Sequence, residues 1–142
     1  NEMVMEQLAV EIVGLCREYG ECRVEVERME EARRVKNALE SVCSMARQRL
    51  DISDPALLLA LLDACEVTRD EGMLQEVLDV VGRNLDRLAV SAESVKLLAC
   101  CYYYVEEEEC AERARRMLEE LRKLGMGEEE LADAETILEE LT

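Results

Sequence analysis

One segment of the chain is apolar around nearly the whole circumference that a helix would present. Residues Ala56–Cys65 carry a single charge, Asp63, among ten positions. A surface helix shows one apolar stripe, whereas a helix with this pattern must be covered on most sides. Pro55 suits the first helical position, where its missing N–H costs nothing. The pattern therefore predicts that Pro55–Val67 is the central helix of an all-α protein.

Apolar residues at three- and four-residue steps predict six further helices. Gly20 is expected to end the first of them as a left-handed C-cap, and the Gly-Met-Gly segment 125–127 separates the last two. Cys22–Glu27 alternates like a strand, so we expect an extended connection there or the first turn of the next helix, whose apolar stripe begins at Met29. The expected ranges are residues 3–19, 25–50, 73–88, 91–105, 106–124 and 128–141.

Most connections between these helices are a few residues long. Short turns place successive helices side by side and antiparallel, which favours helical hairpins. The 142 residues are predicted to form one all-α domain: hairpins over 1–50, 51–90 and 91–126, and a terminal helix over 127–142. We expect the hairpins to stack as a short right-handed solenoid. An irregular helical bundle is the alternative, and the two differ in how the first hairpin docks.

The second and third hairpins share a pattern. A shift of 37 residues places seven apolar positions of the second hairpin on apolar positions of the third. Stacked helix pairs need this arrangement, because the first helix of each pair is covered on several sides. The positions that coincide are Leu58 and Val95, Leu61 and Leu98, Ala64 and Cys101, Cys65 and Tyr102, Leu74 and Ala111, Val77 and Ala114, and Val81 and Leu118.

The third hairpin resembles a tetratricopeptide repeat. Leu98-Ala99-x-x-Tyr102, followed by Ala111, supplies large, small, aromatic and small residues at the spacing with which that family packs its two helices. Arg115 departs from the pattern, because the family has a large apolar residue there. The resemblance implies a stacking fold of the interaction type.

The same hairpin also resembles a pentatricopeptide repeat, with Gly125 as its closing glycine. The likeness to helix-pair repeats covers residues 51–141. Where the pentatricopeptide family reads RNA, a polar residue near the start of the first helix makes the contact, and Lys96 lies near that position. This resemblance implies RNA binding in an organelle as an alternative function.

The charge balance opposes that alternative. Lys and Arg number 17 against 34 Asp and Glu, so the net charge is −17. Nucleic-acid binding and attraction to an anionic membrane both depend on basic groups. A strongly negative protein instead steers basic partners toward itself. We therefore expect no membrane association and a protein partner with a basic surface or peptide.

The sequence offers no chemistry for catalysis or for cofactors. It has no His, which removes the usual bases and metal ligands, and its glycines match neither nucleotide-binding fingerprint. Its seven Cys are odd in number and mostly in apolar positions, which favours buried free thiols in a reducing compartment. We expect no enzyme, no cofactor, no metal and an intracellular protein, in the cytoplasm or alternatively in an organelle.

Four residues are the candidates for partner binding: Tyr103, Tyr104, Glu106 and Glu107. Adjacent helical residues point about 100° apart, so the three consecutive tyrosines cannot all face the core. Tyrosine is enriched at binding hot spots, and the glutamates beside it form an acidic knob. The sequence thus predicts a non-catalytic protein–protein interaction module or scaffold subunit of a larger complex. The RNA-binding alternative requires Arg34, Arg47 and Lys96 to converge.

Overall fold

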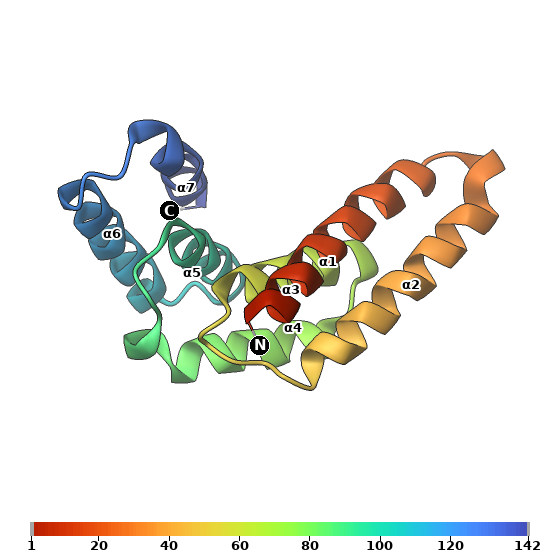
Figure 1. The fold of residues 1–142 in the computed structure, drawn as a ribbon, viewed down its shortest axis with the longest axis horizontal. Coiled ribbons are helices and arrows are strands. Elements are labelled where there is room, and N and C mark those ends of the chain that lie inside the picture. The colour runs from red at the N-terminus through yellow and green to blue at the C-terminus, as the bar shows by residue number, and fades with distance from the viewer. Residues whose placement is uncertain (1, 142) are drawn as a thin grey trace. The chain divides into compact units, whose positions relative to one another are not determined.

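The computed structural model describes residues 2–141, and its regular structure is helical throughout that range, without a strand (Figure 1). The all-α prediction is confirmed, whereas the solenoid arrangement stays a prediction. The α-helices are α1 (Glu2–Cys22), α2 (Met29–Arg47), α3 (Pro55–Thr68), α4 (Glu71–Arg83), α5 (Ala92–Val105), α6 (Glu108–Lys123) and α7 (Glu128–Leu141). Two single 3₁₀ turns, η1 (Val26–Arg28) and η2 (Leu85–Arg87), lie in the connections.

The helix boundaries follow the sequence pattern closely where local caps determine them. The helix α3 begins at Pro55, and α5 begins after Ser91, whose hydroxyl oxygen accepts a hydrogen bond from the Ser94 N–H at 3.1 Å. At the end of α6, Gly125 has φ +85°, and the N–H groups of Gly125 and Met126 donate to the carbonyls of Arg122 and Leu121. This is the Schellman arrangement that a C-terminal glycine permits.

The predicted cap at Gly20 is wrong. The helix α1 continues through Gly20 to Cys22, whose side chain is fully buried. Burial of this thiol favours an extra helical turn. It outweighs the penalty of a glycine inside the helix, which is only about 1 kcal/mol. The second helix is accordingly shorter than predicted, because the residues before Met29 form the η1 turn and α2 ends at Arg47.

The chain divides into two compact units, one up to Val77 and the other from Leu78 onward. The division falls inside α4. The single-domain organisation and the hairpin boundaries given above stay predictions.

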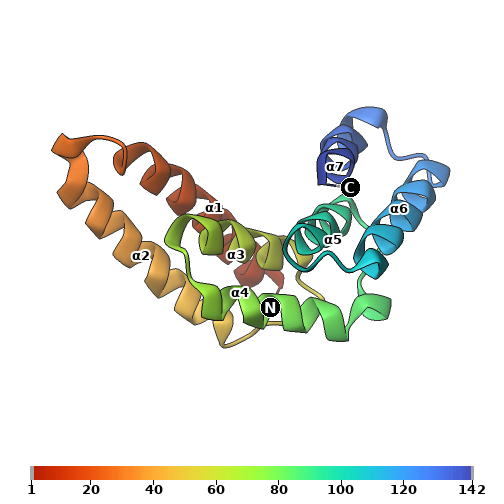
Figure 2. The ribbon, with the colours of Figure 1, turned by 180° about the vertical axis from the view of Figure 1, so that it is seen from behind.

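In the first unit, α1 packs against both α2 and α3, and α2 also contacts α3 (Figures 1 and 2). Ile12 from α1, Leu39 from α2 and Leu61 from α3 are completely buried. Each fully buried aliphatic side chain of this size contributes about 1.5–3 kcal/mol relative to an exposed one. Half of α3 lies in the core, through Leu57, Leu58, Ala60, Leu61, Leu62, Ala64 and Cys65.

In the second unit, α5 packs against both α6 and α7, and α6 contacts α7. The buried side chains of α5 include Val95 and Leu98, and Met117 of α6 and Leu131 of α7 are also buried. Ser94 is a buried polar residue, and its hydroxyl lies 3.0 Å from that of Ser91. Its polar group is therefore satisfied by the residue that caps the same helix.

The two hairpins compared in the sequence also share three of their four helix boundaries, the exception being the later end of α6. The first residues of α3 and α5, Pro55 and Ala92, are 37 positions apart, and so are the first residues of α4 and α6. Arg69 and Glu106, also 37 apart, are the left-handed C-caps of α3 and α5, with φ of 58° and 52°. Membership of a helix-pair repeat family stays a prediction.

A charge placed in the middle of α3 tests its central role. Leu61 is completely buried, whereas Ala56 in the first turn of the same helix is exposed. We expect Leu61→Asp to lower the free energy of unfolding by more than about 4 kcal/mol, because a lone carboxylate would be buried. The matched variant Ala56→Asp should change it by less than about 0.5 kcal/mol. Urea denaturation followed by circular dichroism measures both, and a Leu61→Asp protein as stable as Ala56→Asp would contradict the assignment.

Candidate functional site

The end of α5, the start of α6 and the connection between them form the candidate site, and we call residues 102–109 the α5–α6 corner. The helix α5 ends at Val105, Glu106 adopts a left-handed conformation (φ 52°, ψ 28°), and Glu107 is the N-cap of α6. The Glu106 N–H donates to the Tyr102 carbonyl at 2.7 Å. Glycine usually occupies this conformation, because other L-residues pay about 1–2 kcal/mol for it. The corner therefore holds a glutamate where the backbone favours glycine.

The tyrosines of the corner differ in exposure, as the helical geometry predicts. Tyr103 is 62% exposed, whereas Tyr102 and Tyr104 are half-buried. The rings of Tyr103 and Tyr104 are 5.1 Å apart and inclined by 75°, an edge-to-face contact. Such pairs are favourable beyond the area that they bury. Tyr104 thus supports the ring of Tyr103, which presents its apolar surface and its hydroxyl to solvent.

Carboxylates follow directly after the tyrosines. Glu106, Glu107, Glu108 and Glu109 are all exposed. Among residues 2–141 only Glu108 of these four forms an ion pair, with Arg115 at 3.3 Å. The positive end of the α6 dipole favours acids at this position. The remaining three carboxylates are free to meet a basic group from outside the described chain.

The four predicted site residues fall within five positions of the sequence, and the structure gives them unequal exposure. Tyr103, Glu106 and Glu107 are exposed, and Tyr104 acts from behind as a support for Tyr103. The partner-binding role of all four stays a prediction.

Arg47, a basic residue of α2, makes contacts within the chain and is not available to a partner. Arg47 donates to both carboxylate oxygens of Glu76, at 2.9 and 2.6 Å, and to Asp70 at 3.3 Å. The hydrogen bond from Arg47 lowers the pKa of Glu76 below its usual value. Asp70 also accepts from the Met73 N–H at the start of α4. Arg47 therefore connects α2 to the beginning of α4, while Arg34 remains exposed.

Most of the cysteines lie in the cores. All seven are free thiols, and Cys100 is half-buried while the others are buried. Burial raises the pKa of Cys16 and Cys65 to about 12 and that of Cys43 to about 11. Thiols with such pKa values stay protonated at neutral pH, and the thiolate is the reactive form. Within the described residues no group of three or more Cys, Asp or Glu side chains is placed to hold a metal ion.

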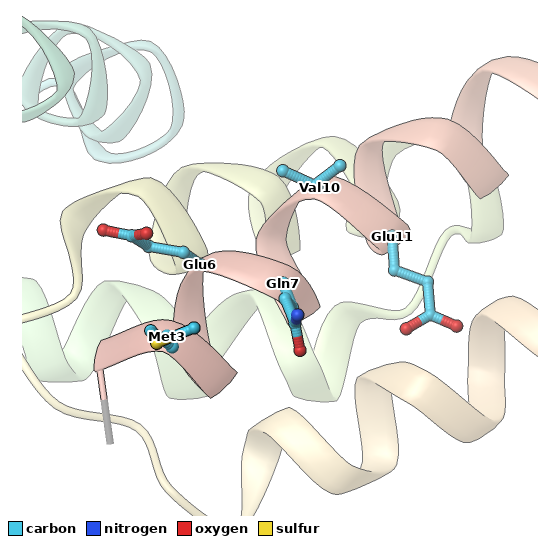
Figure 3. Close-up of a pocket in the computed structure, with 5 residues that line it drawn as sticks. All are labelled: Met3, Glu6, Gln7, Val10 and Glu11. Carbon is cyan, nitrogen blue, oxygen red and sulfur yellow. The ribbon is translucent and has the colours of Figure 1, made fainter.

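A hollow of about 420 Å³ lies on the surface of α1 (Figure 3). It is lined by Met3, Glu6, Gln7, Val10 and Glu11, which all come from this one helix. Their side chains point in different directions in Figure 3. A ligand site usually combines a concave apolar wall with a few convergent polar groups, and this hollow has no such convergence.

Sequence reasoning missed one exposed surface, the connection between α1 and α2. Met29 was expected to begin the apolar stripe of the second helix, but it is 60% exposed, and Val24 and Val26 are exposed even further. The 3.6-residue period does not extend into this connection, because Val24–Glu27 alternates apolar and acidic residues. The alternation of apolar and acidic residues just before a helix start is the feature of the sequence that indicates this exposed surface.

The chain was compared with models of known protein families, with curated proteins and with solved structures, and none of the three comparisons gave a match. The likeness to tetratricopeptide and pentatricopeptide repeats thus stays a prediction from the residues. None of the helices in the described range is both long enough and apolar enough to cross a membrane.

Replacing Glu106 by glycine tests whether the corner adopts the left-handed conformation. We expect Glu106→Gly to raise the free energy of unfolding by about 0.5–1 kcal/mol, because glycine adopts φ near 52° without a steric cost. Glu112→Gly, at an exposed position inside α6, should lower it by about 1 kcal/mol. Thermal and urea denaturation distinguish the two signs. Destabilisation by Glu106→Gly would show that the left-handed cap is not the conformation in solution.

The ion pairs of Arg47 provide a second test. We expect Arg47→Ala to lower the free energy of unfolding by about 1 kcal/mol, since two partly exposed partners lose their charge-assisted bonds. Arg49→Ala, at an exposed position nearby in the sequence, should change it by less than about 0.5 kcal/mol. Equal values for the two variants, measured by urea denaturation, would contradict a structural role for Arg47.

Proposed function

We propose that this chain is a non-catalytic protein–protein interaction module, or a scaffold subunit of a larger complex, that binds a basic partner through the α5–α6 corner. The observation that supports it best is the exposed ring of Tyr103, held edge-to-face by Tyr104 and followed by exposed carboxylates at Glu106 and Glu107.

The chemistry of the corner suits lysine or arginine side chains. An aromatic face attracts a cation by about 0.5–2 kcal/mol, and carboxylates add charge-assisted hydrogen bonds. The contact between the tyrosine rings fixes Tyr103 before a partner arrives, which reduces the entropy lost on binding. The net charge of −17 adds long-range attraction for a basic protein.

The helical architecture supports the same proposal. The common spacing of α3 and α5, and of their left-handed caps, is what two related helix pairs would show. Stacked helix pairs offer extended surfaces that suit protein partners. Free, buried thiols fit a reducing compartment, and we place the protein in the cytoplasm on that ground.

The RNA-binding alternative receives less support. It needs Arg34, Arg47 and Lys96 to be available to phosphates, and Arg47 is already bound to Glu76 and Asp70. Lys96 is half-buried in α5. Each phosphate contact of a nucleic-acid-binding protein needs a free cation.

A pull-down of the tagged chain, split into nuclease-treated and untreated halves, tests the proposal. We expect a stoichiometric protein partner in both halves, and we expect Tyr103→Ala with Tyr104→Ala to weaken its binding by about tenfold or more while the fold is kept. Charge reversal separates a local site from bulk charge. The pair Glu106→Lys and Glu107→Lys should abolish binding, whereas Glu139→Lys and Glu140→Lys, exposed in α7, make the same change in net charge and should retain it.

Three results would contradict the proposal. Partners that disappear with nuclease, with RNA recovered from the untreated half, would favour the RNA-binding alternative. Unchanged binding by the tyrosine variant would remove the corner as the binding surface. Equal losses of binding from the two charge reversals would show that the net charge, and not the α5–α6 corner, causes the interaction.

A further inference from the structure

The connection between α1 and α2 presents the most exposed cluster of apolar side chains in the described chain. We call residues 23–29 the hairpin tip. Val24, Val26 and Met29 are 76%, 83% and 60% exposed, and they lie within six positions. Single exposed apolar residues are normal on protein surfaces, whereas a group of them marks an interaction site or an aggregation risk.

The hairpin tip is held in place by its polar residues. The Arg28 guanidinium donates to both carboxylate oxygens of Glu31, at 3.0 and 3.1 Å, and lies 3.5 Å from the Glu25 carboxylate. The Arg28 N–H donates to the Glu25 carbonyl at 3.1 Å. Arg23 lies over the ring of Tyr19 at 5.8 Å from its centre. The apolar side chains are therefore exposed on an ordered turn. Because the turn is already ordered, little conformational entropy is lost there on binding.

Acidic residues lie next to these apolar ones in the sequence. Residues 21–31 contain five Glu and two Arg, a net charge of −3. Arg28 is paired with Glu25 and Glu31, while Glu27 and Glu30 are exposed and form no ion pair within residues 2–141. The tip thus combines exposed apolar side chains with the acids next to them in the sequence, its acidic border, and its complement is an apolar pocket with a basic border.

We propose that the hairpin tip is a docking surface that inserts Val24, Val26 and Met29 into an apolar pocket of a partner protein, bordered by Lys and Arg. The charge argues against two other occupants. A second copy of the chain would bring the same acidic border onto itself, and an anionic membrane would repel it. The proposal is independent of the α5–α6 corner, because it depends on different residues.

Site-specific photo-cross-linking in the cells that express the chain tests this proposal. A photoreactive benzoyl-phenylalanine replaces Val26 in the full-length chain, and in a matched control it replaces Val10 of α1, which is 74% exposed. We expect a cross-link from position 26 to one protein, absent from position 10. Mass spectrometry of the linked peptide should place the contact in an apolar pocket with Lys or Arg at its border.

Two variants then measure the interaction with that purified partner. Val24→Ser with Met29→Ser should weaken binding by about tenfold or more, and Glu27→Lys with Glu30→Lys should weaken it in a salt-dependent manner. Circular dichroism confirms that both remain folded. The proposal is overturned if position 26 links no better than position 10, if it links to lipid, RNA or a second copy of the chain, or if neither variant weakens binding.

Discussion

Burial of the aliphatic surface of α3 and of α5 is the constraint on which each unit depends. Each helix leaves only a narrow stripe exposed, which contains Asp63 in α3 and Glu93 in α5, so the rest of its surface must be covered by more than one neighbour. In the first unit α1 packs against both α2 and α3, and in the second α5 packs against both α6 and α7. Without Phe or Trp, this packing uses Leu, Val, Ala, Met and Cys, which explains why most of the thiols are buried.

Because the helix faces are taken up by the two cores, the polar interactions concentrate at helix ends. Ser91 caps α5, Gly125 ends α6, and Arg47 joins the end of α2 to the start of α4. Arg69 and Glu106 form left-handed caps, a conformation that glycine adopts at a lower steric cost. A charged residue in a strained backbone conformation is typical of functional sites, where function is gained at the expense of stability.

The sequence predicted the elements whose signals are local. Pro55, Ser91 and Gly125 mark boundaries that the structure confirms, because caps act within one turn. The prediction failed at Gly20, where burial of Cys22 extends α1, and at Met29, whose exposure depends on how the α1–α2 connection folds. For the tyrosines, the 100° spacing required unequal exposure, but only the packing of α5 decides that Tyr103 is the exposed one.

The two proposed surfaces lie at the junctions between successive helices, and this location follows from the same constraint. Val26 lies in the η1 turn, outside the helical period, whereas Tyr103 is an exposed residue in the last turn of α5, so neither exposure opens a core. Both surfaces combine an apolar contact area with carboxylates, in a chain whose net charge is −17. In both proposals, apolar contact supplies affinity and the carboxylates select among partners, because a like-charged surface is repelled while a basic one is attracted. In both proposals the excess of acids therefore favours basic partners at the places where these apolar side chains are exposed.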